Sequence, residues 1–162
     1  MEIQPLVDKY RNDAISFIDD EWGNPIVTKG NIIEIYDLPG FVAIDNEKVV
    51  GAILYQICHK DCEIVAMYSL KQNVGIGTVL IKAVIDNAKD ESCERVWLIT
   101  MNDNTHAIRF YQKRGFSLKR VYINAFKVTQ QLKGIPGSGK DKIVFGIDGI
   151  PILHEFEFEI IL

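Results

Sequence analysis

Residues 72–78 have the make-up of a turn that binds phosphate. They follow a β-rich run and open a helical one, and the start of a helix attracts anions because its backbone N–H groups are unpaired and its dipole is positive there. Glycines at 75 and 77 remove side chains that would keep a pyrophosphate from those N–H groups, and they permit positive φ. The candidate phosphate-binding residues are Gln72, Asn73, Val74, Gly75, Ile76, Gly77 and Thr78, which adds a hydroxyl donor. Two glycines are a weak signal, so a turn that only connects strand to helix is the alternative.

Two other phosphate motifs are incomplete. A dinucleotide fingerprint needs a third glycine where the chain has Leu80, and no ribose-binding acid ends a following strand. The string at 134–140 matches a P-loop up to Lys140, but Asp141 stands where serine or threonine would hold magnesium, and no strand precedes it. We expect a surface loop there.

The cysteines and histidines do not form a metal site. Cys58, His59 and Cys62 are close in sequence, but a closed zinc site needs four ligands and no second pair lies nearby. With Cys93 the thiols are odd in number and have no framework spacing, which indicates reduced cysteines in a cytoplasmic protein. We expect no metal.

Length and composition predict one soluble domain over residues 1–162. Hydrophobic residues make up 48% and charged residues 25% of the chain. The net charge of −4 argues against nucleic acid as a partner, since binding phosphates needs a basic surface. No apolar run is long enough to span a bilayer, and the start lacks a signal peptide, so no membrane partner is expected.

The first half reads as a helix followed by an antiparallel meander. Apolar residues, Trp22 among them, repeat at helical spacing until Gly23-Asn24-Pro25 stops the helix, and 26–40 gives no clear pattern. The expected elements are an edge strand at 2–5, a helix at 7–22, a hairpin of strands 41–44 and 49–57, and a strand at 62–70.

The second half alternates helices with strands. We expect a helix at 76–90, a buried strand at 96–99, a helix at 104–114 with Gly115 as its left-handed C-cap, and a strand at 116–123. A meander followed by this alternation predicts an α/β (α+β mixed-sheet) fold with helices on the sheet faces. The tail is expected to form a helix at 125–133, a loop at 134–142 and a strand at 152–160, whose glutamates face water or a groove.

Two motifs in the right order resemble one known family. The first is Gln72-x-x-Gly75-x-Gly77 after a strand, and the second is Asn104-x-x-Ala107-x-x-Phe110-Tyr111-x-x-x-Gly115-Phe116. They resemble the GCN5-related N-acetyltransferase (GNAT) family, whose signature is Gln/Arg-x-x-Gly-x-Gly/Ala, strongly over about residues 41–118. The resemblance implies an enzyme that transfers an acetyl group from acetyl-CoA to a primary amine by direct attack in a ternary complex. It also implies that the strands at 62–70 and 95–100 splay apart.

The resemblance assigns roles along the cofactor. The pantetheine arm would lie in the gap between the splayed strands, bonded by the backbone near Met67, Tyr68 and Ser69, with the pyrophosphate at 72–78. Asn104 would bond the pantetheine or simply cap its helix. Val74 departs from the family, in which many members have a basic residue, so this site relies more on backbone donors.

Two residues are the catalytic candidates. Tyr111 matches the family's usual general acid, which would protonate a CoA thiolate of pKa about 8.5; a packed core tyrosine is the alternative. Glu63 resembles the base of the histone acetyltransferase branch, although its spacing to Gln72 is shorter, and a solvated residue at a strand start is the alternative. A base or a water relay is useful because alkylamines have a pKa of about 10.4. A backbone N–H could polarise the thioester carbonyl.

Two other classes of function compete. A non-catalytic acyl-CoA sensor would keep the turn but need no Tyr111, and a plain interaction module would bind no CoA. The presence of Tyr111 favours the enzyme. The sequence leaves open which amine is acetylated and whether the chain is a monomer or a homodimer.

Overall fold

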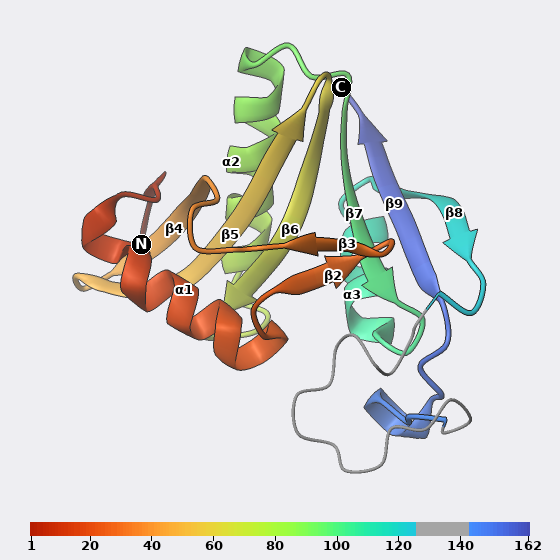
Figure 1. Ribbon diagram of the computed structural model, residues 1–162. Coiled ribbons are helices and arrows are strands. Elements are labelled where there is room, and N and C mark those ends of the chain that lie inside the picture. Colours follow the sequence, from red (N-terminus) through yellow and green to blue (C-terminus); the bar gives the residue numbers. More distant parts are fainter. Residues whose placement is uncertain (126–142) are drawn as a thin grey trace. The chain divides into compact units, whose positions relative to one another are not determined.

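The chain divides into two compact units of mixed α/β structure in a computed structural model that describes residues 1–125 and 143–162 (Figure 1). The first unit consists of 1–26, 33–97 and 161–162, and the second of 27–32 and 98–160. In the described part of the chain, no helix is long and apolar enough to cross a membrane.

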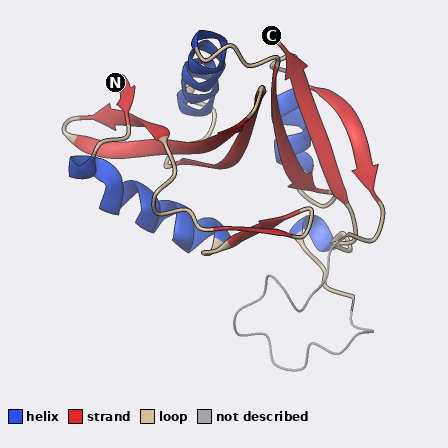
Figure 2. Ribbon diagram, turned by 45° about the horizontal axis from the view of Figure 1, so that its top comes forward, coloured by secondary structure: helices blue, strands red, loops and turns tan. Residues whose placement is uncertain are grey.

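The first unit is built on an antiparallel meander with a helix on each face. Figure 2 shows α1 and α2 on opposite sides of the sheet. Its elements are β1 (Glu2–Pro5), α1 (Asp8–Trp22), β4 (Gly40–Asp45), β5 (Lys48–Cys58), β6 (Asp61–Ser69), α2 (Ile76–Asp90) and the start of β7 (Arg95–Met101). The sheet order β1-β4-β5-β6 confirms the expected edge strand and meander.

Each helix buries the apolar stripe that its sequence predicted. The α1 face packs into a core cluster of buried residues from α1, the strands and two loops: Leu6, Ala14, Ile15, Ile18, Ile35, Val42, Ile44, Val49, Ala52, Leu54 and Ala66. The buried residues of α2 are Ile76, Gly77, Leu80, Ile81, Val84 and Ala88, and this helix packs on β4, β5 and β6. Trp22 is the exception in α1, because its side chain is exposed rather than in the core.

Gly51 on β5 allows α2 to lie close to the sheet. A Cβ atom at this position would come within 2.5 Å of Ile76 Cγ2, 3.1 Å of the Tyr68 carbonyl oxygen and 3.2 Å of Leu80 Cδ1. Real Cβ atoms essentially never approach to 2.5 Å, and the other two distances are tighter than most, so a side chain at Gly51 would push the first turn of α2 outward. The sequence carried one signal for this role, a glycine inside a β-rich run.

Substitutions at Gly51 should destabilise the protein in order of size. Overpacking a core typically costs about 1–3 kcal/mol. We therefore expect the free energy of unfolding to fall from wild type to Gly51→Ala to Gly51→Val, with the valine near the upper end of that range. Urea denaturation monitored by circular dichroism measures this, and a valine variant as stable as wild type would contradict the close approach of α2.

The second unit contains shorter elements. They are α3 (Thr105–Gln112), β8 (Ser117–Tyr122), the one-turn η1 (Ile147–Gly149), β9 (Glu155–Ile161), and most of the hairpin formed by β2 (Ile26–Thr28) and β3 (Asn31–Ile33). Here the end of β7 pairs with β9, and β9 pairs with β8 in antiparallel register. Gly115 has φ of 88°, which confirms the positive φ expected after α3. The helix expected at 125–133 and the loop at 134–142 lie outside the described residues, apart from residue 125.

Candidate functional site

The turn at 72–78 has the open backbone that an anion site needs. Gly75 is the N-cap of α2 with φ of 88°, and its carbonyl accepts from the N–H groups of Thr78 and Val79 at 3.0 and 3.2 Å. In the described part of the chain, the N–H groups of Gly75, Ile76 and Gly77 have no acceptor. Nothing lies within 4 Å of the place where a Gly75 side chain would begin. These N–H groups can therefore reach a ligand oxygen.

The side chains around this turn leave it accessible. Residues 72–75 and Thr78 are exposed, whereas Ile76 and Gly77 are buried where α2 meets the sheet. Val74 is 57% exposed and adds no charge. The first turn of α2 has no acidic residue, so nothing within the helix opposes an anion at its positive end.

Along β6, the backbone N–H and C=O groups of successive residues point alternately toward β5 and toward the opposite edge of the strand. The Leu70 N–H donates to the Val50 carbonyl at 2.9 Å, and the register continues as Gly51 opposite Ser69 and Ile53 opposite Met67. Because bonded and non-bonded pairs alternate in an antiparallel ladder, the N–H and C=O groups of Met67 and Ser69 point away from β5.

The other atoms of these three residues have their own contacts. The backbone groups of Tyr68 point toward β5 by the same alternation, and its ring stacks on Phe17 with centroids 5.0 Å apart. The Met67 carbonyl accepts from Trp22 Nε1 at 3.1 Å. The Ser69 hydroxyl donates to the Lys71 carbonyl at 2.8 Å. A pantetheine arm along this edge of β6 would therefore meet the backbone groups of Met67 and Ser69. From Tyr68 it would meet the side chain and not the backbone.

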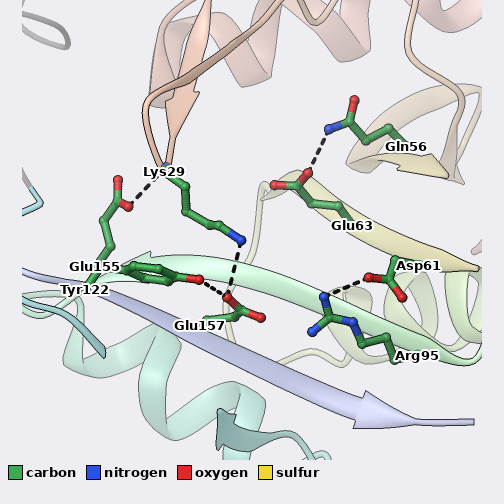
Figure 3. A network of polar contacts seen from close by, with 8 residues as sticks. All are labelled: Lys29, Gln56, Asp61, Glu63, Arg95, Tyr122, Glu155 and Glu157. Carbon is green, nitrogen blue, oxygen red and sulfur yellow. Dashed lines mark hydrogen bonds and ion pairs between the residues drawn. The ribbon is translucent and has the colours of Figure 1, made fainter. Parts of the chain in front are cut away.

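Glu63 is buried near the start of β6 and is not the solvated residue that the sequence offered as an alternative. Its side chain accepts from Gln56 Nε2 at 2.7 Å, and the residue is 6% exposed (Figure 3). Gln56 lies opposite Glu63 on β5 and orients the carboxylate. Next to Glu63 in sequence, burial raises the pKa of the Cys62 thiol to about 12, so this thiol stays protonated at neutral pH.

Tyr111 is buried near the C-terminal end of α3. Its ring packs edge to face on Phe110 and Phe116, with ring centroids 5.2 and 5.5 Å apart. Tyr111 therefore has the packing role that the sequence offered as the alternative. The residue is 8% exposed, and its hydroxyl is the one ionisable group of the side chain. Burial raises the pKa of this hydroxyl and Arg114 opposes the rise, so it keeps its proton at neutral pH. A general acid must hold its proton, but the raised pKa also makes this phenol a weaker acid.

Asn104 caps α3. Its Oδ1 accepts from the Ala107 N–H at 3.0 Å, which is the plain N-cap that the sequence left open. Contact of Asn104 with a pantetheine stays a prediction. Tyr111 and Asn104 belong to the second unit, whereas Glu63, the edge of β6 and the turn belong to the first. The splay of β6 from β7 also stays a prediction, because β7 begins in the first unit and continues into the second after Trp97.

A second polar network, which sequence reasoning missed, lies in the second unit. At the tip of the β2–β3 hairpin, the Lys29 N–H donates to Glu155 at 3.1 Å and its ammonium pairs with Glu157 at 3.4 Å (Figure 3). The Tyr122 hydroxyl donates to the same oxygen of Glu157 at 2.5 Å. Burial raises the pKa of Glu155, and its hydrogen bond from Lys29 opposes this. Glu155 and Glu157 are thus buried and do not face water.

No cluster of three or more histidine, cysteine, aspartate or glutamate side chains in the described ranges is arranged to hold a metal ion. Cys58, Cys62 and Cys93 are free thiols.

Comparison with known proteins assigns the chain to a family. The profile of the Acetyltransferase (GNAT) family matches residues 8–116, so the chain belongs to this family. It is 41% identical over 119 residues to "Uncharacterized protein YdhI" of Bacillus subtilis, covering 72% of this chain and 74% of the relative. It is 28% identical over 138 residues to "N-alpha-acetyltransferase 30" of Schizosaccharomyces pombe, covering 75% of this chain and 90% of that one.

A solved structure confirms the fold class. A GNAT family acetyltransferase from Elizabethkingia anophelis, crystallised with acetyl-CoA, superposes with a TM-score of 0.71 at 20% identity, over 99% of this chain and 97% of that one. The resemblance inferred from the two sequence motifs and the expected mixed α/β fold are therefore both confirmed.

Proposed function

We propose that the chain is an acetyl-CoA-dependent N-acetyltransferase that acetylates a primary amine and works as a single domain in the cytoplasm. The observation that carries the proposal is the start of α2, where three neighbouring backbone N–H groups are without an acceptor in the described part of the chain. Such a helix start suits a pyrophosphate. Membership of the GNAT family supports acetyl-CoA as the donor.

The donor would be held along one continuous backbone path. The N–H groups of residues 75–77 would bind the pyrophosphate, and the outward edge of β6 at Ser69 and Met67 would bond the amides of the pantetheine arm. Because most of these contacts use main-chain groups, the binding depends on the fold rather than on basic side chains.

Transfer then needs two proton movements. The neutral amine attacks the thioester carbonyl, a C–N bond forms, the C–S bond breaks, and the electron pair leaves on sulfur. The proton lost by the nitrogen goes to Glu63, directly or through water, and the thiolate takes a proton from the Tyr111 hydroxyl. Gln56 holds the Glu63 carboxylate in place, and Tyr111 carries the proton that the thiolate needs.

A charge change at Val74 tests the phosphate site. Val74→Glu would place a carboxylate next to the bound pyrophosphate, and we expect the affinity for acetyl-CoA to fall at least about tenfold, equivalent to about 1.4 kcal/mol. A carboxylate at a helix start stabilises the helix, so weaker binding would not come from unfolding. Isothermal titration calorimetry measures this.

The control is Val74→Gln, which has the same size without the charge. It should bind acetyl-CoA within about threefold of wild type, or about 0.7 kcal/mol. Equal affinities for the glutamate and glutamine variants would remove the pyrophosphate from this turn.

A non-catalytic acyl-CoA sensor is the competing function. It shares the binding turn and differs in chemistry, so it would bind acetyl-CoA but release no CoA with any amine. Free thiol released from acetyl-CoA in the presence of amines distinguishes the two.

A further inference from the structure

Trp22 lies where α1 meets β6, the strand proposed to hold the pantetheine arm. It is the last residue of α1, and Gly23, with φ of 81°, ends the helix by donating its N–H to the Asp19 carbonyl at 2.8 Å. The indole is 49% exposed, which is unusual for so large an apolar side chain. Its Nε1–H donates to the Met67 carbonyl on β6 at 3.1 Å.

Two contacts fix this end of α1 on β6. The Trp22 bond fixes the indole, and the Phe17 ring, just over one turn earlier, stacks on Tyr68 at an interplanar angle of 16°. The Met67 carbonyl that Trp22 binds points away from β5. This is the edge along which the pantetheine arm is proposed to lie, so the indole stands beside the path of the arm.

The position along β6 identifies which end of the arm Trp22 meets. A strand advances about 3.3 Å per residue, so Met67 lies roughly 7 Å back along the strand from Ser69, where β6 ends and the chain leads into the turn at 72–78. An extended pantetheine arm has about as many bonds from its phosphate oxygen to its sulfur as four strand residues, so it spans roughly 13 Å. An arm that starts from a pyrophosphate at the turn is therefore long enough to pass Ser69 and bring its thioester to Met67 and Trp22.

We propose that Trp22 determines which acyl group the enzyme accepts, because its half-exposed indole closes the space beyond the thioester and leaves room for a two-carbon acyl group only. This inference rests on the proposed function, because it takes the position of the thioester from the proposed path of CoA. The hydrogen bond to Met67 holds the ring in place, and a large rigid ring with a fixed N–H excludes longer chains by steric clash.

Binding of acyl-CoA thioesters tests the proposal without an acceptor. Titration calorimetry with acetyl-CoA and hexanoyl-CoA should show that the wild type prefers acetyl-CoA by at least about tenfold. Trp22→Ala should bind the two equally while keeping its affinity for acetyl-CoA. Trp22→Phe and Trp22→Leu, which reduce the side chain in steps, should give intermediate ratios, and they also serve if the alanine variant does not fold.

The matched control is Tyr36→Ala. Tyr36 is another exposed aromatic residue tied to α1, by a 3.3 Å hydrogen bond from its hydroxyl to Asn12, but it makes no hydrogen bond to β6 in the described residues. Its loss should leave the acetyl-to-hexanoyl ratio unchanged.

The outcomes separate the two proposals. A wild type that binds both thioesters equally, or Trp22 variants that fold, bind acetyl-CoA and keep the wild-type ratio, would overturn the role of Trp22 alone. A wild type that binds neither thioester would overturn the proposed function, and the role of Trp22 with it.

Discussion

Replacing Tyr111 with phenylalanine is expected to slow acetyl transfer by about 10²–10⁴-fold, the usual contribution of general acid catalysis. The change removes one oxygen from a ring that Phe110 and Phe116 hold in place, so the packing stays. The affinity for acetyl-CoA should hardly change, because Tyr111 is not part of the turn. Single-turnover kinetics at saturating acetyl-CoA measure the chemical step.

A second buried tyrosine supplies the control. Tyr55 on β5 is buried, stacks on Phe41 at 6.0 Å, and has its pKa raised mainly by burial, as Tyr111 has. Tyr55→Phe should transfer acetyl at the wild-type rate. Full single-turnover activity of a folded Tyr111→Phe enzyme would make Tyr111 a packing residue.

Replacing Glu63 with glutamine should lower kcat/KM at neutral pH by about 10²-fold or more and change its pH dependence. If Glu63 takes the proton of the amine, the ascending limb of the wild-type profile depends on this side chain. Glutamine keeps an oxygen for the bond from Gln56 but accepts no proton, so this ascending limb should disappear or move.

Glu94→Gln is the control for the pH profile. Its carboxylate is 67% exposed and pairs with Lys60 on the surface of the same unit, so the profile of this variant should match that of the wild type. An unchanged profile in Glu63→Gln would instead point to another base, or to an acceptor amine that is already neutral.

The sequence predicted those elements that have a clear hydrophobic period. The meander β4–β6 and helix α2 agree with expectation to within one or two residues, because alternation and helical spacing are strong over such lengths. The strands β2 and β3 were missed, since three residues each are too short to show a period.

The side chains of the tail were harder to predict than its strand. Alternation in β9 predicted the strand but suggested that Glu155 and Glu157 face water or a groove, whereas both are buried against Lys29 and Tyr122. Alternation shows which residues share a face of a strand. It does not show that the β2–β3 hairpin, far away in sequence, packs Lys29 on that face.

In the candidate site, too, local features could be predicted from the sequence and contacts between distant segments could not. The motif around Gly75 could be recognised because a local turn and helix start depend on neighbouring residues. The packing of Ile76 over Gly51, which leaves no space for a Cβ atom, and the hydrogen bond of Trp22 to Met67 join segments that are far apart in sequence. Helical spacing grouped Trp22 with the apolar face of α1 that packs into the core. Spacing shows which residues share a face of a helix, but not how far along the helix the sheet covers that face.

Acetyl transfer to an amine is the central activity proposed for this protein. The decisive measurement is the release of CoA thiol from acetyl-CoA by the wild-type protein across a panel of primary amines, including amino acids, polyamines and peptides with a free N-terminus or lysine. We expect CoA release that requires at least one amine, with an equal amount of N-acetylated amine found by mass spectrometry. Tight binding of acetyl-CoA with no amine-dependent release from any member of the panel would contradict this activity and favour the acyl-CoA sensor.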